Sequence, residues 1–206
     1  METQIPSVKF CGMQRREDIL AANTLHPDYV GFVFAPKSRR CVTPDQVRRL
    51  KSLLSPEIRA VGVFVNEKPV IVASLLNQEI IDLAQLHGTE DEAYIAELRL
   101  LTDKPLIQAF VVRSKEDLAA AESSSADHIL LDAGAGSGAA FDWTILTGFP
   151  RPYFLAGGLS ADNVGRAVRT LHPFAVDVSS GIETEGIKDP EKMRRFMEQI
   201  QTASRP

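Results

Sequence analysis

Two apolar runs near the end of the chain each finish in glycine or serine residues that could bind a phosphate group. Residues 153–159 read Tyr-Phe-Leu-Ala-Gly-Gly-Leu, and residues 175–181 read Ala-Val-Asp-Val-Ser-Ser-Gly. Glycines let backbone N–H groups approach an anion closely, and serine hydroxyls donate further hydrogen bonds. A Gly-Gly pair after a strand is more often only a turn, but the order and spacing of the two runs predict a cradle for a phosphate ester.

Four other residues could carry acid-base or anion-binding chemistry. Cys11 is either a thiolate base or a small buried apolar residue, since free cysteine is often buried. Asp132 ends an apolar run, where desolvation would raise its pKa and make it a general acid, or else it caps the next segment. His87 reads as a hydrogen-bonded histidine at a rim. Arg40 either clamps a carboxylate through two parallel bonds or is solvated in a charged loop.

The sequence argues against metal and cofactor chemistry. Its cysteines and histidines have no paired metal-ligand spacing, and no nicotinamide, ATP or Ser-His-Asp motif is present. We therefore expect no cofactor, no metal, and a site that moves protons around a phosphorylated substrate. The residues concerned are Cys11, Cys41, His26, His87, His128 and His172.

Charge and hydropathy narrow the partners and the compartment. The formal net charge is −4 and the sequence pI is about 5.6, which argues against nucleic acid or an acidic membrane as a partner. We find no apolar run long enough for a membrane span and no secretory signal at the N-terminus. Two cysteines are too few for a disulfide framework and fit a reducing compartment. These features predict a cytoplasmic protein.

Short runs rich in Val, Ile, Phe and Leu recur along the chain, each followed by a segment of helical periodicity. Eight such units without a dividing linker predict a single α/β domain over residues 1–206, a (β/α)8 TIM barrel with a closed sheet of parallel strands. An open doubly wound sheet is the alternative, but it would favour a glycine-rich fingerprint after the first strand. The expected strands are residues 8–11, 29–34, 60–65, 81–86, 105–110, 128–132, 153–156 and 174–179.

Alternation along these strands predicts which side chains point into the barrel. The polar set would face inward and its apolar neighbours would face the helices, so Cys11, His87, Asp132 and Ser179 would converge on the mouth where barrel active sites lie. Strands one and eight are neighbours in a closed barrel, so we expect an interior ion pair between Lys9 and Asp177. Such a pair either favours one conformation or helps to hold the site.

At these residues the chain resembles the phosphoribosylanthranilate isomerases of tryptophan biosynthesis, an aromatic amino acid pathway. The similarity runs almost end to end, and the order of the motifs makes it specific. The motifs are Lys9-Phe10-Cys11-Gly12, Gly31-Phe32-Val33-Phe34, Pro36-Lys37-Ser38-Arg39-Arg40, Gly62-Val63-Phe64-Val65-Asn66, Gln85-Leu86-His87-Gly88, Leu131-Asp132-Ala133, Gly136-Ser137-Gly138, Phe141-Asp142-Trp143, Leu155-Ala156-Gly157-Gly158-Leu159, Asn163-Val164, and Asp177-Val178-Ser179-Ser180-Gly181-Ile182-Glu183 with Gly186, Lys188-Asp189 and Lys192.

The resemblance implies an Amadori rearrangement of N-(5-phosphoribosyl)anthranilate. It makes Asp132 the general acid that opens the ribose ring and Cys11 the general base that removes the C2 proton. It places Arg40 on the anthranilate carboxylate. An ordinary thiol is mostly protonated at neutral pH, so Cys11 would need help that the sequence does not identify. The phosphate would be held by Gly157, Gly158, Ser179, Ser180 and Gly181.

Several alternatives stay open. The chain has Arg39 where the family commonly has proline, Cys41 where it has an aromatic, and Met13-Gln14 after the first strand, all of which bear on the anthranilate end of the site. The related histidine-pathway isomerase, a dual-substrate form, and a noncatalytic phosphate-ligand barrel are the other functions. A monomer or a homodimer is expected. Gly134, Gly136 and Gly138 predict that the loop after strand six moves.

Overall fold

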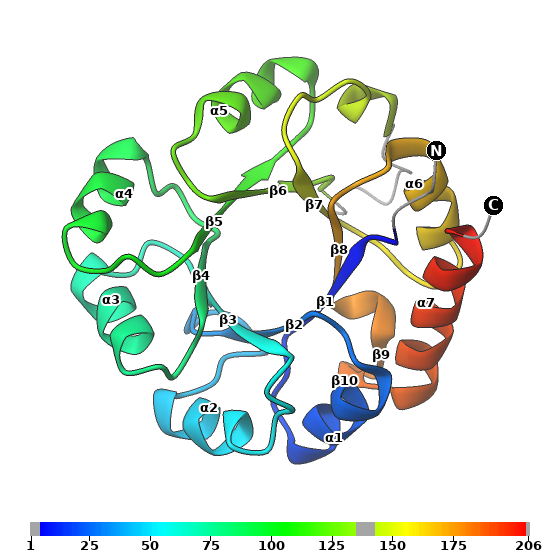
Figure 1. The fold of residues 1–206 in the computed structure, drawn as a ribbon, viewed down its shortest axis with the longest axis horizontal. Coiled ribbons are helices and arrows are strands. Elements are labelled where there is room, and N and C mark those ends of the chain that lie inside the picture. Colours follow the sequence, from blue (N-terminus) through cyan, green and yellow to red (C-terminus); the bar gives the residue numbers. More distant parts are fainter. Residues whose placement is uncertain (1–4, 135–142, 205–206) are drawn as a thin grey trace.

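Eight parallel strands close into a barrel, with helices arranged around its outside (Figure 1). The computed structural model describes residues 5–134 and 143–204. Each strand pairs with the next along the chain, and β1 pairs with β8 to complete the ring. The fold class predicted from the sequence is therefore confirmed, and the open doubly wound sheet is excluded.

The barrel strands lie within two residues of the ranges expected from the sequence. They are β1 Ser7–Cys11, β2 Tyr29–Val33, β3 Arg59–Phe64, β4 Leu83–Leu86, β5 Leu106–Val111, β6 His128–Asp132, β7 Tyr153–Ala156 and β8 Ala175–Val178. The α-helices are α1 Arg16–Leu25, α2 Pro44–Lys51, α3 Pro69–Asn77, α4 Glu92–Arg99, α5 Leu118–Ser123, α6 Val164–Leu171 and α7 Pro190–Ala203. A small hairpin, β9 Glu183–Thr184 with β10 Ile187–Lys188, follows β8.

Two of the predicted units differ in detail. Between β6 and β7 the described residues hold a short 3₁₀-helix, Trp143–Leu146, where the sequence predicted a helix like the others. Ser179 lies just beyond β8 and precedes the 3₁₀ turn Ser180–Ile182, although it was expected inside the strand. Glycines and prolines around these connections shorten the regular segments.

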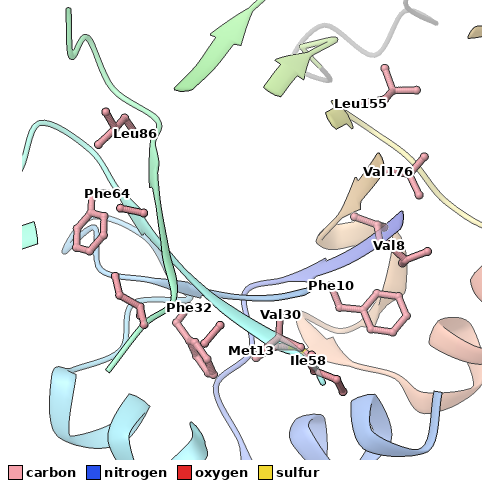
Figure 2. Packing of buried hydrophobic residues seen from close by; sticks show 14 of the residues in the cluster. Val8, Phe10, Met13, Val30, Phe32, Ile58, Phe64, Leu86, Leu155 and Val176 are labelled. Atoms are coloured by element: carbon pink, nitrogen blue, oxygen red, sulfur yellow. The ribbon is translucent and has the colours of Figure 1, made fainter. Parts of the chain in front are cut away.

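The core has an outer layer and an inner layer. Figure 2 shows part of the outer layer, where Val8, Phe10, Leu155 and Val176 pack in one buried hydrophobic cluster. A second cluster fills the barrel itself. Because alternate residues of a strand face opposite sides, this division confirms the predicted inward and outward faces. The inner cluster comprises Tyr29, Val61, Leu83, Ile107, Leu130, Phe154, Ala156 and Ala175.

Candidate active site

The predicted site residues from five strands gather at the carboxyl end of the barrel. Cys11 and Asp132 are the last residues of β1 and β6, and His87 directly follows β4. In a parallel barrel the carboxyl ends of all strands open onto one face. The loops after β7 and β8 open onto the same face, so the structure brings the predicted acid-base and phosphate residues to one mouth.

Cys11 lies against a buried ion pair. The Lys9 side chain is fully buried inside the barrel, and its Nζ donates to Oδ1 of Asp177 at 2.8 Å. This confirms the interior ion pair predicted from strand parity. Burial raises the pKa of the Cys11 thiol, and the positive charge of Lys9 opposes that effect without cancelling it.

Asp132 faces His87 across the mouth. Its Oδ2 lies 3.6 Å from Nε2 of His87, and its Oδ1 accepts a hydrogen bond from the N–H of Gly134 at 2.9 Å. Burial alone would raise the pKa of Asp132, but the interactions with His87 and Gly134 outweigh burial and lower it. The prediction that desolvation raises this pKa is therefore wrong. Asp132 is therefore a carboxylate at neutral pH in this structure.

Gln85 sets the proton position on His87. The Gln85 side chain is buried on β4, and its amide nitrogen lies 2.7 Å from Nδ1 of His87. An amide nitrogen can only donate, so Nδ1 accepts and the ring proton lies on Nε2, toward Asp132. His87 is thus the hydrogen-bonded rim histidine that the sequence indicated.

The loop after β4, which carries His87, is tied to the loop after β3 by Glu90. The Glu90 carboxylate accepts hydrogen bonds from the N–H groups of Asn66 and Gly88, at 2.6 and 2.7 Å. A Cβ atom at position 88 would lie only 2.4 Å from Oδ1 of Asn66. Glycine at position 88 therefore allows the loop after β4 to pack directly against Asn66.

Arg40 is held by a carboxylate of the protein itself. Its Nε and Nη2 donate to the two oxygens of Glu183 at 2.6 and 2.8 Å, and Lys188 donates to the same group at 2.8 Å. Burial would raise the pKa of Glu183, but the hydrogen bonds from Arg40 and Lys188 lower it to about 2. Arg40 is thus neither solvated nor free in this structure; Arg39 also bonds to Glu183.

The two glycine and serine runs meet at the mouth as predicted. Gly157 and Gly158 both have positive φ, and a Cβ at Gly157 would lie 2.7 Å from the backbone nitrogen of Ala133. A Cβ at Gly181 would lie 1.9 Å from the carbonyl oxygen of Leu159, so the loops after β7 and β8 are in backbone contact. Only glycine allows such a close approach of the two backbones.

Ser179 and Ser180 complete this part of the mouth. The Ser179 hydroxyl donates to the carbonyl oxygen of Cys11 at 3.0 Å, and Lys188 Nζ lies 2.9 Å from the carbonyl oxygen of Ser179. Ser180 is exposed. Ser179 therefore links the phosphate loop directly to the strand end that carries Cys11.

Glu183 and Lys188 lie within the family motifs, but no role was predicted for them from the sequence, nor for Gln85. All three side chains are buried and charged or polar, at the ends of elements that reach the mouth. The alternation of side chains along β4 places Gln85 on the same inward face as His87, so the sequence contained a signal for Gln85. Glu183 and Lys188 lie in the hairpin after β8, where no strand parity applies. The predicted movement of the loop with Gly134 stays a prediction, because residues 135–142, including Gly136 and Gly138, lie outside the described residues.

Residues 8–199 match the model of a protein family described as N-(5'phosphoribosyl)anthranilate (PRA) isomerase. The chain belongs to this PRA isomerase family. Relatives agree over nearly the full length. The PRA isomerase of Endomicrobium trichonymphae is 44% identical over 194 residues, covering 92% of this chain and 95% of its own. That of Thermoanaerobacter sp. (strain X514) is 45% identical over 201 residues, covering 94% and 97%.

Solved PRA isomerase structures share the barrel. The enzyme of Thermotoga maritima superposes with a TM-score of 0.88 at 34% identity, covering 96% of this chain and 99% of that one. A PRA isomerase in complex with reduced 1-(o-carboxyphenylamino)-1-deoxyribulose 5-phosphate superposes with a TM-score of 0.86, at 34% identity and the same coverage. The ligand of that second protein is a phosphate ester that carries an aromatic carboxylate.

Within residues 5–134 and 143–204, no group of three or more His, Cys, Asp or Glu side chains is placed to hold a metal ion. Over the same described residues, no helix is both long and apolar enough to cross a membrane.

Proposed function

We propose that this protein isomerises N-(5-phosphoribosyl)anthranilate to 1-(2-carboxyphenylamino)-1-deoxyribulose 5-phosphate, with Asp132 as general acid and Cys11 as general base. The observation that carries the proposal is the shared mouth: a thiol and a carboxylate end two strands beside paired glycine and serine loops. Membership of the PRA isomerase family supports the reaction and substrate class.

The proposed reaction uses the Asp132 carboxyl group and the Cys11 thiol in the positions that the barrel gives them. Asp132 donates a proton to the ribose ring oxygen, the C1–O bond breaks, and the anthranilate nitrogen forms a Schiff base with C1. Cys11 then takes the proton from C2, which gives an enolamine that tautomerises to the ketone product. The substrate gains one proton from Asp132 and loses one to Cys11, so its own protons balance. The starting forms return when Cys11 releases its proton to solvent and Asp132 takes one up.

The remaining residues bind the substrate. The phosphate lies against Gly157, Gly158, Ser179, Ser180 and Gly181, whose backbone N–H groups and hydroxyls suit an anion. Arg40 meets the anthranilate carboxylate through Nη1, because its Nε and Nη2 already bond to Glu183. His87 contacts the sugar beside Asp132.

The setting of the activity is part of the proposal. Residues 1–206 act as one domain in the cytoplasm, as a monomer or homodimer. The partner is a small phosphorylated aminosugar, with no nucleic acid and no membrane bound. The negative net charge supports this, since an anionic polymer or surface would be repelled.

The test of this function generates phosphoribosylanthranilate in place, adds purified protein and follows the loss of anthranilate fluorescence. Rapid loss with the wild-type protein is expected. Turnover of the histidine-pathway aminoaldose instead would assign the chain to the related isomerase, and turnover of both would indicate a dual-substrate enzyme. Tight substrate binding with no turnover would indicate a noncatalytic barrel.

The pH dependence of kcat/KM tests the paired roles. The reactive form needs Asp132 protonated and Cys11 ionised, whereas the pKa of Asp132 is lowered and that of Cys11 is raised. Between the two pKa values the pair carries one proton in total, and the reactive arrangement is a constant fraction of that state. We therefore expect kcat/KM to stay level through neutral and mildly alkaline pH and to fall only above the pKa of Cys11.

Initial rates measured from about pH 6 to about pH 10 check this expectation. A tenfold rise per pH unit through neutrality would contradict it, because that slope is the signature of a thiolate base acting without an acid partner. Far-UV circular dichroism across the same range provides the control for unfolding.

A further inference from the structure

A lysine buried beneath the proposed base has no role in the mechanism described so far. Lys9 stands two residues before Cys11 on β1, points into the barrel on the same face, and has no exposed surface. Burying an ammonium group is costly unless it is paired. Asp177 on β8 supplies one partner at 2.8 Å, and a pure ion pair would need no thiol nearby.

The neighbouring strand leaves a space for the thiol and the ammonium together. Gly31 on β2 is the register partner of Cys11. A Cβ at Gly31 would lie 2.8 Å from Sγ of Cys11 and 3.2 Å from Nζ of Lys9. The two groups therefore both pack against Gly31, and any side chain at position 31 would press on them.

Four charged groups act on the Cys11 thiol. Lys9 on the same strand, Lys188 on β10 and Arg40 after β2 are cations, and Asp177 on β8 is an anion. Lys188 and Arg40 are both bonded to Glu183, which weakens their fields at Cys11. Lys9 is the cation with the largest effect on the thiol.

Lys9 cannot serve as the base itself. Burial lowers its pKa, but the charges of Asp177 and Cys11 outweigh burial and raise it above the ordinary value for lysine. The side chain therefore stays an ammonium ion, with no lone pair to accept the C2 proton. An ammonium ion beside a thiol instead favours the thiolate.

We propose that Lys9 is the positioning residue for Cys11: its ammonium group, fixed by Asp177, holds and stabilises the thiolate in the space that Gly31 leaves open. The inference deepens the proposed function, since it rests on Cys11 being the base. It supplies the help for Cys11 that the sequence did not identify.

The test measures the pH dependence of Cys11 alkylation by iodoacetamide, without substrate, in a Cys41→Ser background that leaves one thiol. The double variant Lys9→Met/Asp177→Asn removes both charges together and so avoids an unpaired buried ion. We expect the alkylation midpoint to move up, because the effect of Lys9 on the thiol exceeds the opposing effect of Asp177, which is lost with it. The pH-independent value of kcat/KM should fall about tenfold for each pH unit by which the midpoint rises. The reason is that the fraction of Cys11 present as thiolate falls by the same factor.

Asp177→Asn alone separates charge from structure. The carboxylate disfavours the thiolate, so its removal is expected to lower the midpoint while Lys9 remains. A purely structural ion pair predicts no shift in either variant. If the double variant keeps the wild-type circular dichroism and an unchanged midpoint, the proposal is overturned.

A pair of glycine variants decides the question even if the charge variants do not fold. Gly31→Ala places a methyl group against the thiol and should raise the midpoint by separating Sγ from Nζ. Gly62→Ala on β3 is the matched control, because its Cβ would be crowded by Ile81 and Phe64, away from the thiol. Equal midpoints in both variants would contradict the proposal.

These outcomes stay distinct from failure of the proposed function. Alkylation reports on the coupling between Lys9 and Cys11 whether or not the protein turns over substrate. A Cys11→Ala variant with normal turnover would refute the catalytic assignment and leave the alkylation result to be judged by itself.

Discussion

Cys11→Ala is expected to lower kcat about a thousandfold, within the range for loss of a general base. Alanine fits the nearly filled space at the end of β1 and removes the thiol that we propose as the acceptor of the C2 proton. The phosphate loops and Arg40 keep their contacts, so KM should change little. Steady-state rates with anthranilate fluorescence as the readout measure both constants.

The second cysteine gives the matched control. Cys41 is half-buried after β2, and we expect Cys41→Ala to keep kcat within about twofold of wild type, as for a residue without a catalytic role. A Cys11→Ala enzyme with near-normal kcat would remove Cys11 from the mechanism. Equal losses in the two variants would point to general damage from cysteine replacement.

Asp132→Asn is expected to lower kcat by a similar factor of about a thousand, because an amide cannot donate a proton to the ring oxygen and return to its starting state. The asparagine carbonyl can still accept the hydrogen bond from Gly134, so the rim keeps its shape. Both kcat and kcat/KM should fall together, since the lost interaction belongs to the transition state.

Asp127 directly precedes β6, at the end of the strand opposite the mouth. Its carboxylate provides a control of the same chemical type. Its carboxylate accepts from the backbone N–H of Leu106 and bonds to Arg99, far along the strand from the mouth. Asp127→Asn should cost about 1 kcal/mol or more of stability and leave kcat unchanged. Loss of turnover in Asp127→Asn with normal turnover in Asp132→Asn would reverse our assignment.

The fold was predictable because its signals are local. Each strand is a short apolar run, and each run is followed by a segment of helical periodicity. Eight such units predict a closed barrel. The sequence predicted a helix between β6 and β7 like the others, but the described part of this connection holds only a 3₁₀-helix, Trp143–Leu146. Parity worked equally well for the inward polar residues, since side chains alternate along any strand regardless of what surrounds it.

The sequence by itself determined the barrel, the inward face with Lys9 and Asp177, and the candidate acid and base. Only the tertiary structure decided the electrostatics of the mouth. Arg40 and Glu183 are 143 residues apart in sequence, yet form a bidentate ion pair. Asp132 has its pKa lowered, against expectation, because His87 and Gly134 lie beside it. Charge interactions depend on distance in space and on burial, and both are set when barrel closure brings distant strand ends together.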